Sequence, residues 1–384
     1  MISFFNNCIK LIKLLINSKY ILQKPDKKKF LIIDGRNKEL LFKYINKKDC
    51  NILYTRGEFL NLYVAFKCLF NLSYKGIHFS YINQYIKSCD PQLCVTLNHP
   101  KTYFYKLKKT HKNLKTIAFQ NGHTVLSQKN KFLMNIKYEK HNNLSADYIF
   151  VQNKFFLNNL FKKYINSKFI TIGSFKNNYF FRRKNKVKKN RKKIIFISQF
   201  RMPKNLKNIG YNYKQFYCTE YIILPKIQNF AKKNNYSFEI LGSEWSFIDE
   251  KNFYSKILIN KNWKFHKRTS KNLSYYKTDE ADISIFVDSN LGFESLARGN
   301  KTISFNFKSK IDSKYYNFGF NFLKKSGNFW TNEDNDKEFF RLMNYAKKVS
   351  SKDWNNENKS LIVKIMENDP DNKKFKNILS KITN

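Results

Sequence analysis

A turn of small and polar residues at 288–292, DSNLG, is the part of the sequence best suited to hold a phosphate. It follows the apolar run 285–287 and leads into a short predicted helix. The first amides of a helix point outward with the positive end of its dipole behind them, so they attract anions. Gly292 would leave room for a phosphate, and Ser289 could donate a hydroxyl hydrogen to it; the alternative is a tight turn alone. Glu294 could accept from a ribose hydroxyl or cap the helix. The residues of this candidate phosphate site are Asp288, Ser289, Asn290, Leu291 and Gly292.

The elements that must position this turn are strands that alternate with helices. Short apolar runs bounded by polar or glycine-containing turns recur along the chain and are typical of buried strands. They occur at 29–34, 51–55, 92–97, 115–119, 146–151 and 168–172, and again at 193–197, 236–241, 263–266 and 282–287. Helices are expected between them, including 59–70, 220–233 and 271–277. The alternation predicts an α/β protein with parallel sheets that are covered by helices on both faces.

A basic segment, KNNYFFRRKNKVKKNRKK at 176–193, interrupts this alternation, which then restarts. We interpret it as a linker between two Rossmann-like domains that face each other across a cleft, the alternative being a solvated loop inside one domain. The polar, helical end of the chain could fold back on the first domain. The expected parts are an N-terminal helix (1–28), a first domain (29–175), a linker (176–192), a second domain (193–345) and a helical tail (346–384).

The composition is strongly basic, with a formal net charge of +45 in 384 residues. Arginine supplies only nine of the 73 basic residues, and Lys, Asn, Ile, Phe and Tyr are enriched together, as codon bias in an AT-rich genome would produce. Specific nucleic-acid readers use arginine forks as well as lysines, so we expect no nucleic-acid partner. The charge still favours an anionic partner such as a nucleotide, a phosphorylated glycan or an acidic membrane surface.

The first 22 residues are apolar at helical spacing with lysines in between. SFFNNCIKLIKLLINSKYIL at 3–22 lacks the features of a signal peptide, and its polar residues interrupt any membrane span. We expect an amphipathic helix that either packs on the body of the protein or lies on the inner leaflet of the membrane. The protein is therefore predicted to be cytoplasmic, or peripheral on the cytoplasmic face of the inner membrane.

No metal site is expected. Glu333-Asp-Asn-Asp336 has the spacing of an Asp-x-Asp metal motif, but it lies in a polar stretch near the C-terminus rather than at the end of a central strand. We interpret it as a solvated helix start. The histidines at 78, 99, 111 and 141 have no metal-ligand spacing among them.

The turn and its surroundings, VDSNLGFESLARGNKTISF at 287–305, resemble the donor-site motif of the surface carbohydrate biosynthesis transferases. Further segments also resemble this family: SQFR at 198–201, SYYKTDEADISIFVDS at 274–289, GNFWTN at 327–332, NDPDNKKF at 368–375, FLIIDGRNKELL at 30–41 and IAFQNGHT at 117–124. The resemblance covers most of 29–380 and is strongest at 280–305. It implies a GT-B glycosyltransferase with a nucleotide-activated sugar in the C-terminal domain, an acceptor in the N-terminal domain and no cofactor.

The resemblance also implies which residues hold the donor. In such folds the base and ribose contact the strand ends that precede the phosphate turn. The residues at those positions here are Ser198, Gln199, Arg201, His266, Lys267 and Arg268. Helix amides together with Ser289, Arg201 or Arg268 could stabilise the charge that develops on the leaving phosphate, without a metal.

The acceptor hydroxyl needs a general base, which we expect at a strand end of the N-terminal domain. The candidates are His123, Glu58 and Asp34. His123 titrates near neutrality, whereas Glu58 is expected at a helix start that would lower its pKa and weaken it as a base. The candidate acceptor-binding residues are Asn98, His99, Gln120, Asn121 and Gly122.

Other functions stay open. A sugar-nucleotide 2-epimerase and a teichoic-acid-type glycerol- or ribitol-phosphate transferase would share the fold and a similar donor turn. A basic protein that binds nucleic acid or a membrane surface is the non-enzymatic alternative. Its binding to nucleic acid would weaken steeply with salt, whereas binding of a sugar nucleotide would persist.

Overall fold

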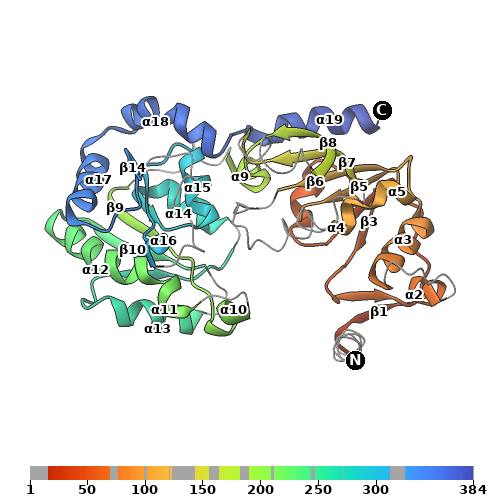
Figure 1. Ribbon diagram of the computed structural model, residues 1–384, viewed down its shortest axis with the longest axis horizontal. Coiled ribbons are helices and arrows are strands. Elements are labelled where there is room, and N and C mark those ends of the chain that lie inside the picture. Colours follow the sequence, from red (N-terminus) through yellow and green to blue (C-terminus); the bar gives the residue numbers. More distant parts are fainter. Residues whose placement is uncertain are drawn as a thin grey trace. The chain divides into compact units, whose positions relative to one another are not determined.

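The computed structural model describes residues 16–69, 77–98, 102–120, 122, 143–154, 164–181, 190–208, 212–243, 247–270, 272–311 and 325–383. The chain forms two compact units, each with its own parallel sheet (Figure 1). The N-terminal unit comprises Met1–Asn121, Lys131–Thr171 and Lys374–Asn384, and the C-terminal unit comprises Gly122–Asn130 and Ile172–Lys373.

The N-terminal unit is built on six parallel strands in the order β3-β2-β5-β6-β7-β8. Their bounds are β2 Phe30–Ile33, β3 Cys50–Leu53, β5 Leu93–Thr96, β6 Lys115–Phe119, β7 Leu144–Val151 and β8 Ile165–Thr171. The described helices here are η1 Lys38–Lys43, η2 Lys47–Asp49, α2 Leu62–Leu69, α3 Ile77–Cys89, α4 Thr102–Tyr105, α5 Leu107–Thr110 and α19 Lys373–Thr383. Strand β2, the first strand of this sheet along the chain, pairs with β3 on one side and with β5 on the other. The strand order therefore reverses between β2 and β5, where α/β proteins leave a crevice for ligands.

The C-terminal unit has seven strands in the order β11-β10-β9-β12-β13-β15-β14, parallel except for β14. The first six of these follow the 3-2-1-4-5-6 order of the Rossmann fold, which reverses between β9 and β12. The strands are β9 Asn190–Ile197, β10 Ser237–Leu241, β11 Lys264–His266, β12 Ala281–Phe286, β13 Thr302–Phe305, β14 Ser326–Gly327 and β15 Trp330–Thr331. The helices are α9 Phe175–Phe180, α10 Pro203–Asn208, α11 Tyr213–Phe216, α12 Cys218–Lys233, α13 Phe247–Ile257, α14 Leu273–Glu280, α15 Asn290–Ala297, α16 Lys308–Ile311, α17 Asp336–Lys348, α18 Ser351–Ile365 and η6 Pro370–Asn372.

The ten predicted strands are confirmed to within a few residues because strands buried on both faces have continuous apolar sequences. All six residues of β12 are buried, as are all four of β13. One large apolar core fills the C-terminal unit, from Phe196 on the central strand to Trp354 on α18, both fully buried. This core holds β9 and β12 side by side and so fixes the edge of the sheet that follows them.

The predicted linker and one predicted helix differ from the structure. Residues 176–192 were interpreted as a linker, but α9 occupies the first part and β9 already begins at Asn190. Asn177 and Asn178 are fully buried there, so this part of the segment is held by packing, and the two units divide after Thr171. The predicted helix 59–70 begins as a strand, β4 (Phe59–Asn61), and becomes helical only at Leu62.

The predicted N-terminal helix is wrong at its end, since residues 19–21 form strand β1 (Lys19–Ile21), which pairs in parallel with β4. Its part at 1–15 lies outside the described residues.

The predicted tail divides between the two units. Its last helix, α19, packs on the N-terminal sheet, where the Phe375 ring lies 5.1 Å from that of Phe119 and Lys29 Nζ donates to Thr383 O at 2.8 Å.

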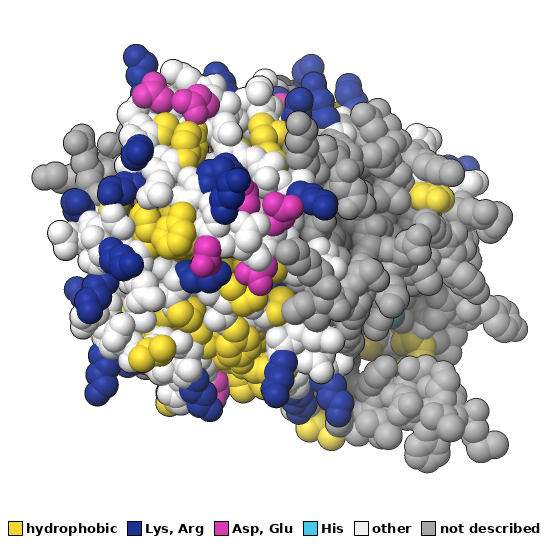
Figure 2. Space-filling view, turned by 60° about the vertical axis from the view of Figure 1, so that its left-hand side comes forward, with side chains coloured by type: hydrophobic (Ala, Val, Ile, Leu, Met, Phe, Trp, Pro, Cys, Tyr) yellow, Lys and Arg dark blue, Asp and Glu magenta, His cyan; other side chains and the backbone are white. Residues whose placement is uncertain are grey.

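Basic side chains are dispersed on the face of the C-terminal unit that Figure 2 presents. Lysines and arginines alternate there with acidic and apolar side chains and form no continuous basic stripe. Among the helices of the described part of the chain, none is long and apolar enough to span a membrane.

Candidate functional site

Four polar side chains meet at the edge of the C-terminal sheet where the strand order reverses. Gln199 follows β9, Asp288 follows β12, Lys308 follows β13, and Glu220 lies in the first turn of α12. Gln199 Nε2 donates to Glu220 Oε1 at 2.6 Å, and Lys308 Nζ lies 3.2 Å from Asp288 Oδ2. We refer to these four residues as the switch-point cluster. Only Asp288 reaches solvent to a notable extent, with 24% of its side chain exposed.

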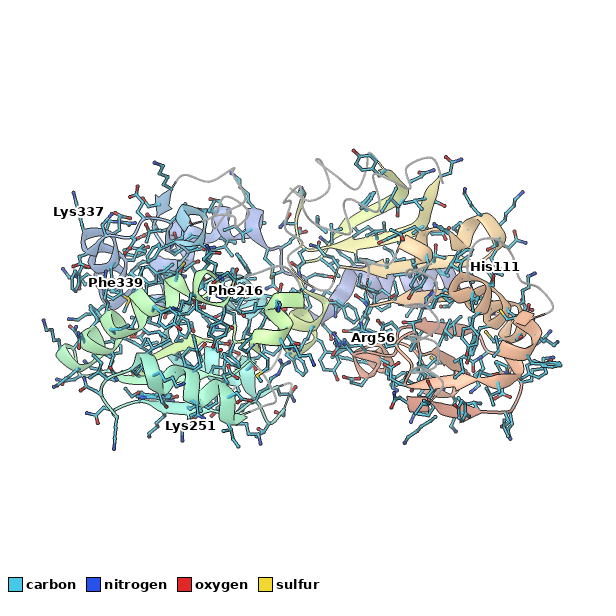
Figure 3. All side chains as sticks on the ribbon, turned by 60° about the horizontal axis from the view of Figure 1, so that its bottom comes forward. Arg56, His111, Phe216, Lys251, Lys337 and Phe339 are labelled. Atoms are coloured by element: carbon cyan, nitrogen blue, oxygen red, sulfur yellow. The ribbon has the colours of Figure 1, made fainter. Side chains whose placement is uncertain are left out.

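Sequence reasoning missed two residues of this cluster, Lys308 and Glu220. Glu220 lies beside Gln199, a predicted donor residue. It is fully buried, and among the described residues its second carboxylate oxygen, Oε2, has no hydrogen-bond partner. Burial raises the pKa of this carboxyl to about 7, although the Lys308 ammonium and the Gln199 hydrogen bond lower it. Lys308 itself is 1% exposed, and its ammonium lies 3.9 Å from the centre of the Phe216 ring, which is labelled in Figure 3.

The predicted phosphate turn lies next to this cluster. Ser289 is the N-cap residue of α15 and makes no side-chain cap hydrogen bond, so its hydroxyl is not used by the helix. Asp288, Ser289, Asn290 and Leu291 are partly exposed. Gly292 is buried, however, and its amide already donates to Ser289 O at 2.9 Å. The close neighbour of Gly292 is the Phe286 ring, so the glycine serves packing and not the approach of a phosphate.

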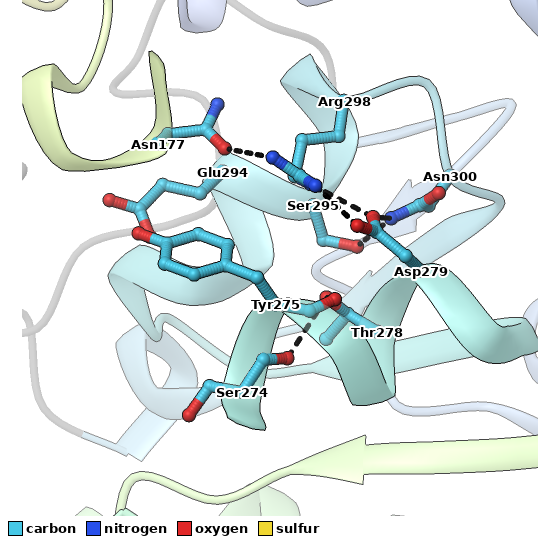
Figure 4. A network of polar contacts seen from close by, with 9 residues as sticks. All are labelled: Asn177, Ser274, Tyr275, Thr278, Asp279, Glu294, Ser295, Arg298 and Asn300. Carbon is cyan, nitrogen blue, oxygen red and sulfur yellow. Dashed lines mark hydrogen bonds and ion pairs between the residues drawn. The ribbon is translucent and has the colours of Figure 1, made fainter. Parts of the chain in front are cut away.

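Glu294 does not face solvent as a ribose ligand would. It is 5% exposed and receives three hydrogen bonds, from Ser174 Oγ at 2.5 Å, Asn290 Nδ2 at 2.7 Å and Tyr275 Oη at 2.8 Å. These donors come from the segment before α9, from α15 itself and from α14. The carboxylate therefore holds three segments together and orients Asn290 at the start of α15. Figure 4 shows Glu294 beside Tyr275.

Arg298, at the end of α15, continues this buried network (Figure 4). Its guanidinium binds both carboxylate oxygens of Asp279 on α14, with Nε 2.8 Å from Oδ1, and its Nη1 donates to Asn177 at 3.2 Å. Asn300 Nδ2 also donates to Asp279 Oδ1 at 2.9 Å. Arg298 is thus a structural residue.

The strand ends on the other side of β9 are occupied by a second buried carboxylate. Ser198 Oγ donates to Glu250 of α13, and Ser243 donates to the same carboxylate through its amide at 2.8 Å. Tyr254 Oη donates to Ser198 Oγ at 2.6 Å. Ser198 was predicted to bind the donor, but its hydroxyl is used inside the protein, so it supports the loop rather than a ligand.

The remaining predicted donor residues differ in how exposed they are and in their hydrogen bonds. Arg201 is exposed, and its backbone is fixed by Tyr217, whose Oη accepts from the Arg201 amide at 2.6 Å. Lys267 is also exposed, while Arg268 is partly buried and donates from Nη1 to Ser243 O at 3.2 Å. His266 Nε2 lies 2.6 Å from Glu239 Oε2. His266 is therefore bonded to Glu239 on the sheet, and Arg201 and Lys267 are exposed at the carboxyl edge.

In the N-terminal unit, three predicted or neighbouring residues meet where that sheet reverses its order. Asp34 follows β2, Arg56 follows β3 (Figure 3) and Asn98 follows β5. Arg56 donates to Asp34 Oδ2 from Nη2 at 2.6 Å and from Nε at 3.0 Å, and Asn98 Nδ2 donates to it at 2.7 Å. Burial raises the pKa of Asp34, but these hydrogen bonds and the Arg56 charge outweigh it, so the pKa is lowered overall. Asp34 is therefore a poor general base, and the side-chain amide of Asn98 is used to bind its carboxylate.

The other predicted acceptor and catalytic residues are only partly described. Glu58 is exposed and accepts from the Arg56 amide at 3.2 Å. It precedes strand β4 and not a helix, so the predicted position at a helix start is wrong. Gln120 is buried and accepts from the Gln152 amide at 2.9 Å. Gly122 is grouped with the C-terminal unit, where an added Cβ would lie 3.8 Å from Asn290 Oδ1. Three further residues lie outside the described ones: His99, Asn121 and His123.

In the described part of the chain, no three His, Cys, Asp or Glu side chains lie together in a group that could hold a metal ion. Asp336, the last residue of the Asp-x-Asp-like stretch, is the first residue of α17. Its Oδ1 lies 2.7 Å from Lys226 Nζ, and 71% of its side chain is exposed. This is the solvated helix start that the sequence indicated.

Comparison of the sequence with protein families gives a match over residues 117–383 to a family described as "putative O-antigen biosynthesis protein". The match spans more than half of the chain. The chain belongs to this O-antigen biosynthesis family. The predicted membership in a surface carbohydrate biosynthesis family is thereby confirmed. None of the curated proteins matches the sequence.

Solved structures similar to this O-antigen biosynthesis protein establish its fold. A variant of the wall teichoic acid polymerase TagF has a TM-score of 0.52 at 13% identity, over 94% of this chain and 89% of the other. The UDP-GlcNAc 2-epimerase of Neisseria meningitidis, solved with UDP-GlcNAc, has a TM-score of 0.51 at 10% identity over 92% and 98%. That of Methanocaldococcus jannaschii has 0.50 at 12% identity over 86% and 98%. The predicted GT-B fold of two Rossmann-like units is confirmed.

Proposed function

We propose that this protein is a glycosyltransferase that moves a sugar from a nucleotide-activated donor to a cell-surface polysaccharide or a lipid-linked glycan. The observation that carries the proposal is the start of α15, which stands beside the strand reversal of a Rossmann-type sheet. Ser289, Asn290 and Leu291 are partly exposed there, and the Ser289 hydroxyl is not used to cap the helix. Such an edge suits a nucleotide diphosphate because helix amides and dipole attract its charge.

The chemistry follows from charge at the leaving group. When the sugar is transferred, the bond between its anomeric carbon and the donor phosphate breaks, and the electron pair stays on the phosphate oxygen. The start of α15, the Ser289 hydroxyl and the exposed Arg201 are suited to stabilise that charge, so the proposed reaction needs no metal. The acceptor hydroxyl loses its proton to a base, for which His123 is our leading candidate, since the pKa of Asp34 is lowered by its ion pair with Arg56.

Two related reactions compete with this proposal, because the structural neighbours include a teichoic acid polymerase and 2-epimerases. A glycosyltransferase should release nucleoside diphosphate only when an acceptor is added. An epimerase would invert C2 of the sugar without an acceptor, and a glycerol- or ribitol-phosphate transferase would release CMP from a CDP-linked donor.

The test begins with thermal unfolding in the presence of UDP, GDP, CMP, dTDP and CDP compounds. A ligand at 100 times its Kd stabilises a two-state fold by about 2.7 kcal/mol, which shifts the midpoint measurably. The donor found is then incubated with and without lipid-linked glycan acceptors, and the released nucleotide and the sugar are analysed. Stabilisation by none of the compounds would contradict the proposal, and C2 inversion without acceptor would replace it by the epimerase.

A further inference from the structure

Large apolar side chains are exposed at one end of the N-terminal unit, in a group that the proposed reaction does not use. The described residues include twelve large, exposed apolar side chains, and six of them belong to this group, with exposed fractions from 37% to 74%. The other six are dispersed over the C-terminal unit. We call the group the N-terminal apolar surface; it consists of Ile16, Tyr20, Ile21, Leu22, Phe66 and Ile77.

The six residues come from neighbouring elements. Strand β1 pairs with β4, with Ile21 opposite Asn61, and α2 starts directly after β4. Asn61 Nδ2 donates to Gln23 O at 2.9 Å, which fixes Leu22 and its neighbours beside the start of α2. Helix α2, which carries Phe66, packs against α3, which begins at Ile77. Figure 1 shows β1, α2 and α3 together at the end of this unit where the chain starts.

Strand β1 exposes every one of its residues, Lys19 to Ile21. A strand with one face on a core normally alternates buried apolar and exposed polar residues. The consecutive exposed residues Ile21 and Leu22 depart from this alternation. Exposed apolar groups of this kind mark surfaces that another partner covers.

The charged residues around the N-terminal apolar surface indicate what kind of partner would bind there. Exposed lysines border the apolar residues: Lys19 on β1, Lys24 after it and Lys67 on α2. Lys67 Nζ lies 4.8 Å from the centre of the Tyr63 ring, one helical turn from Phe66. The nearby acidic Glu58 is engaged by the Arg56 amide. An apolar centre with a lysine border complements the interface of a bilayer that contains anionic lipids.

We propose that the N-terminal apolar surface docks the protein on an anionic membrane, with Leu22 and Phe66 inserted at the headgroup level and the bordering lysines on lipid phosphates. The docking is independent of the proposed transfer reaction. A second copy of the chain could also cover an apolar surface, but like-charged lysines would then face one another across the contact. Each lysine near an anionic surface strengthens binding roughly fivefold, and the effect weakens with salt.

The test is co-sedimentation of the full chain with vesicles of phosphatidylcholine containing 30% phosphatidylglycerol, and with phosphatidylcholine alone. The variant Leu22→Glu/Phe66→Glu should bind the anionic vesicles at least tenfold more weakly than the parent. The matched control is Ile248→Glu/Ile259→Glu, which changes two exposed apolar residues of the C-terminal unit (68% and 89%) and should bind like the parent. Because all four side chains are exposed, thermal unfolding should be unchanged in both variants.

A second variant separates lipid charge from apolar insertion. Lys19→Gln/Lys24→Gln/Lys67→Gln should lose the preference for phosphatidylglycerol. Equal vesicle binding by the parent, Leu22→Glu/Phe66→Glu and the control would overturn the proposal. So would a parent dimer, seen by light scattering, that Leu22→Glu/Phe66→Glu dissociates while vesicle binding is unchanged, because the surface would then bury a second copy of the chain.

Discussion

Gly292 packs against the ring of Phe286 so closely that a Cβ built on the glycine would lie 2.1 Å from both Cγ and Cδ2 of that ring. Phe286 ends β12 and is fully buried in the core of the C-terminal unit. The glycine therefore lets α15 approach the strand that precedes it. The start of α15 can then lie beside the strand end, where an anion could meet it.

This contact predicts that Gly292→Ala destabilises the protein, although alanine favours a helix over glycine by about 0.5–1 kcal/mol. Overpacking of a core typically costs about 1–3 kcal/mol, and Gly292→Val should cost more. Valine at this position thus cannot test phosphate binding in a folded protein. Urea unfolding measures the loss, with Ser289→Ala as a control that should change stability by less than about 0.5 kcal/mol.

The same contact predicts coupling between the two residues. In a double-mutant cycle, Phe286→Leu should recover part of the stability that Gly292→Ala loses, because the smaller side chain gives the new methyl group room. Additive losses would show that Phe286 is not the obstacle.

The buried Glu220 predicts a distinct pH dependence of stability. Its pKa is raised from 4.5 to about 7 on folding, so the folded state holds this proton more tightly than the unfolded state. The stabilising contribution is complete below pH 4.5 and is lost as the pH rises through 7; the total is on the order of 3 kcal/mol. Glu220→Gln should remove this decline between pH 5 and 8, while Glu357→Gln, an exposed control on α18, should follow the parent. Parallel curves for parent and Glu220→Gln, from urea unfolding at each pH, would contradict the assignment.

Two arginine–carboxylate pairs allow a direct comparison of burial. Arg298→Met leaves Asp279 as an uncompensated buried charge and should cost about 3–5 kcal/mol. Arg341→Met breaks a similar pair with Glu338, but Arg341 is 38% exposed, so about 0–1 kcal/mol is expected. Chemical unfolding measures both values. A small loss for Arg298→Met would mean that the network around α14 and α15 does not hold them together.

Asp34 is predicted to stabilise the N-terminal unit and not to act as the base. Asp34 has a φ of +66°, which asparagine tolerates, so Asp34→Asn changes the charge without straining the backbone. Its folded pKa is lowered, so its stabilising contribution is present above the unfolded pKa and lost as the pH falls through the folded pKa. Asp34→Asn should therefore lower stability at pH 7 by about 1–3 kcal/mol. Loss of transfer without loss of stability would instead favour Asp34 as a catalytic residue.

The sequence by itself determined the strands, their alternation with helices and the restart of the pattern in a second unit. These features are local: a strand buried on both faces must be apolar along its whole length, as Ile194–Ile197 and Ile283–Phe286 are. The motif that resembles the surface carbohydrate family is also contiguous in sequence. The match to an O-antigen biosynthesis family confirms the family that this motif indicated. The position of the turn after β12 followed from the same local pattern.

Only the tertiary structure decided what the polar side chains contact. Glu294 accepts a hydrogen bond from Ser174, which is 120 residues away in sequence. Glu220 lies beside Gln199 and Lys308 because the start of α12 packs next to the ends of the strands. The residue type and position of Gly292 predict a phosphate-binding glycine, but the Phe286 ring packs against it. Hydrogen bonding and burial depend on which elements meet in space, and residue type and spacing along the chain do not specify that.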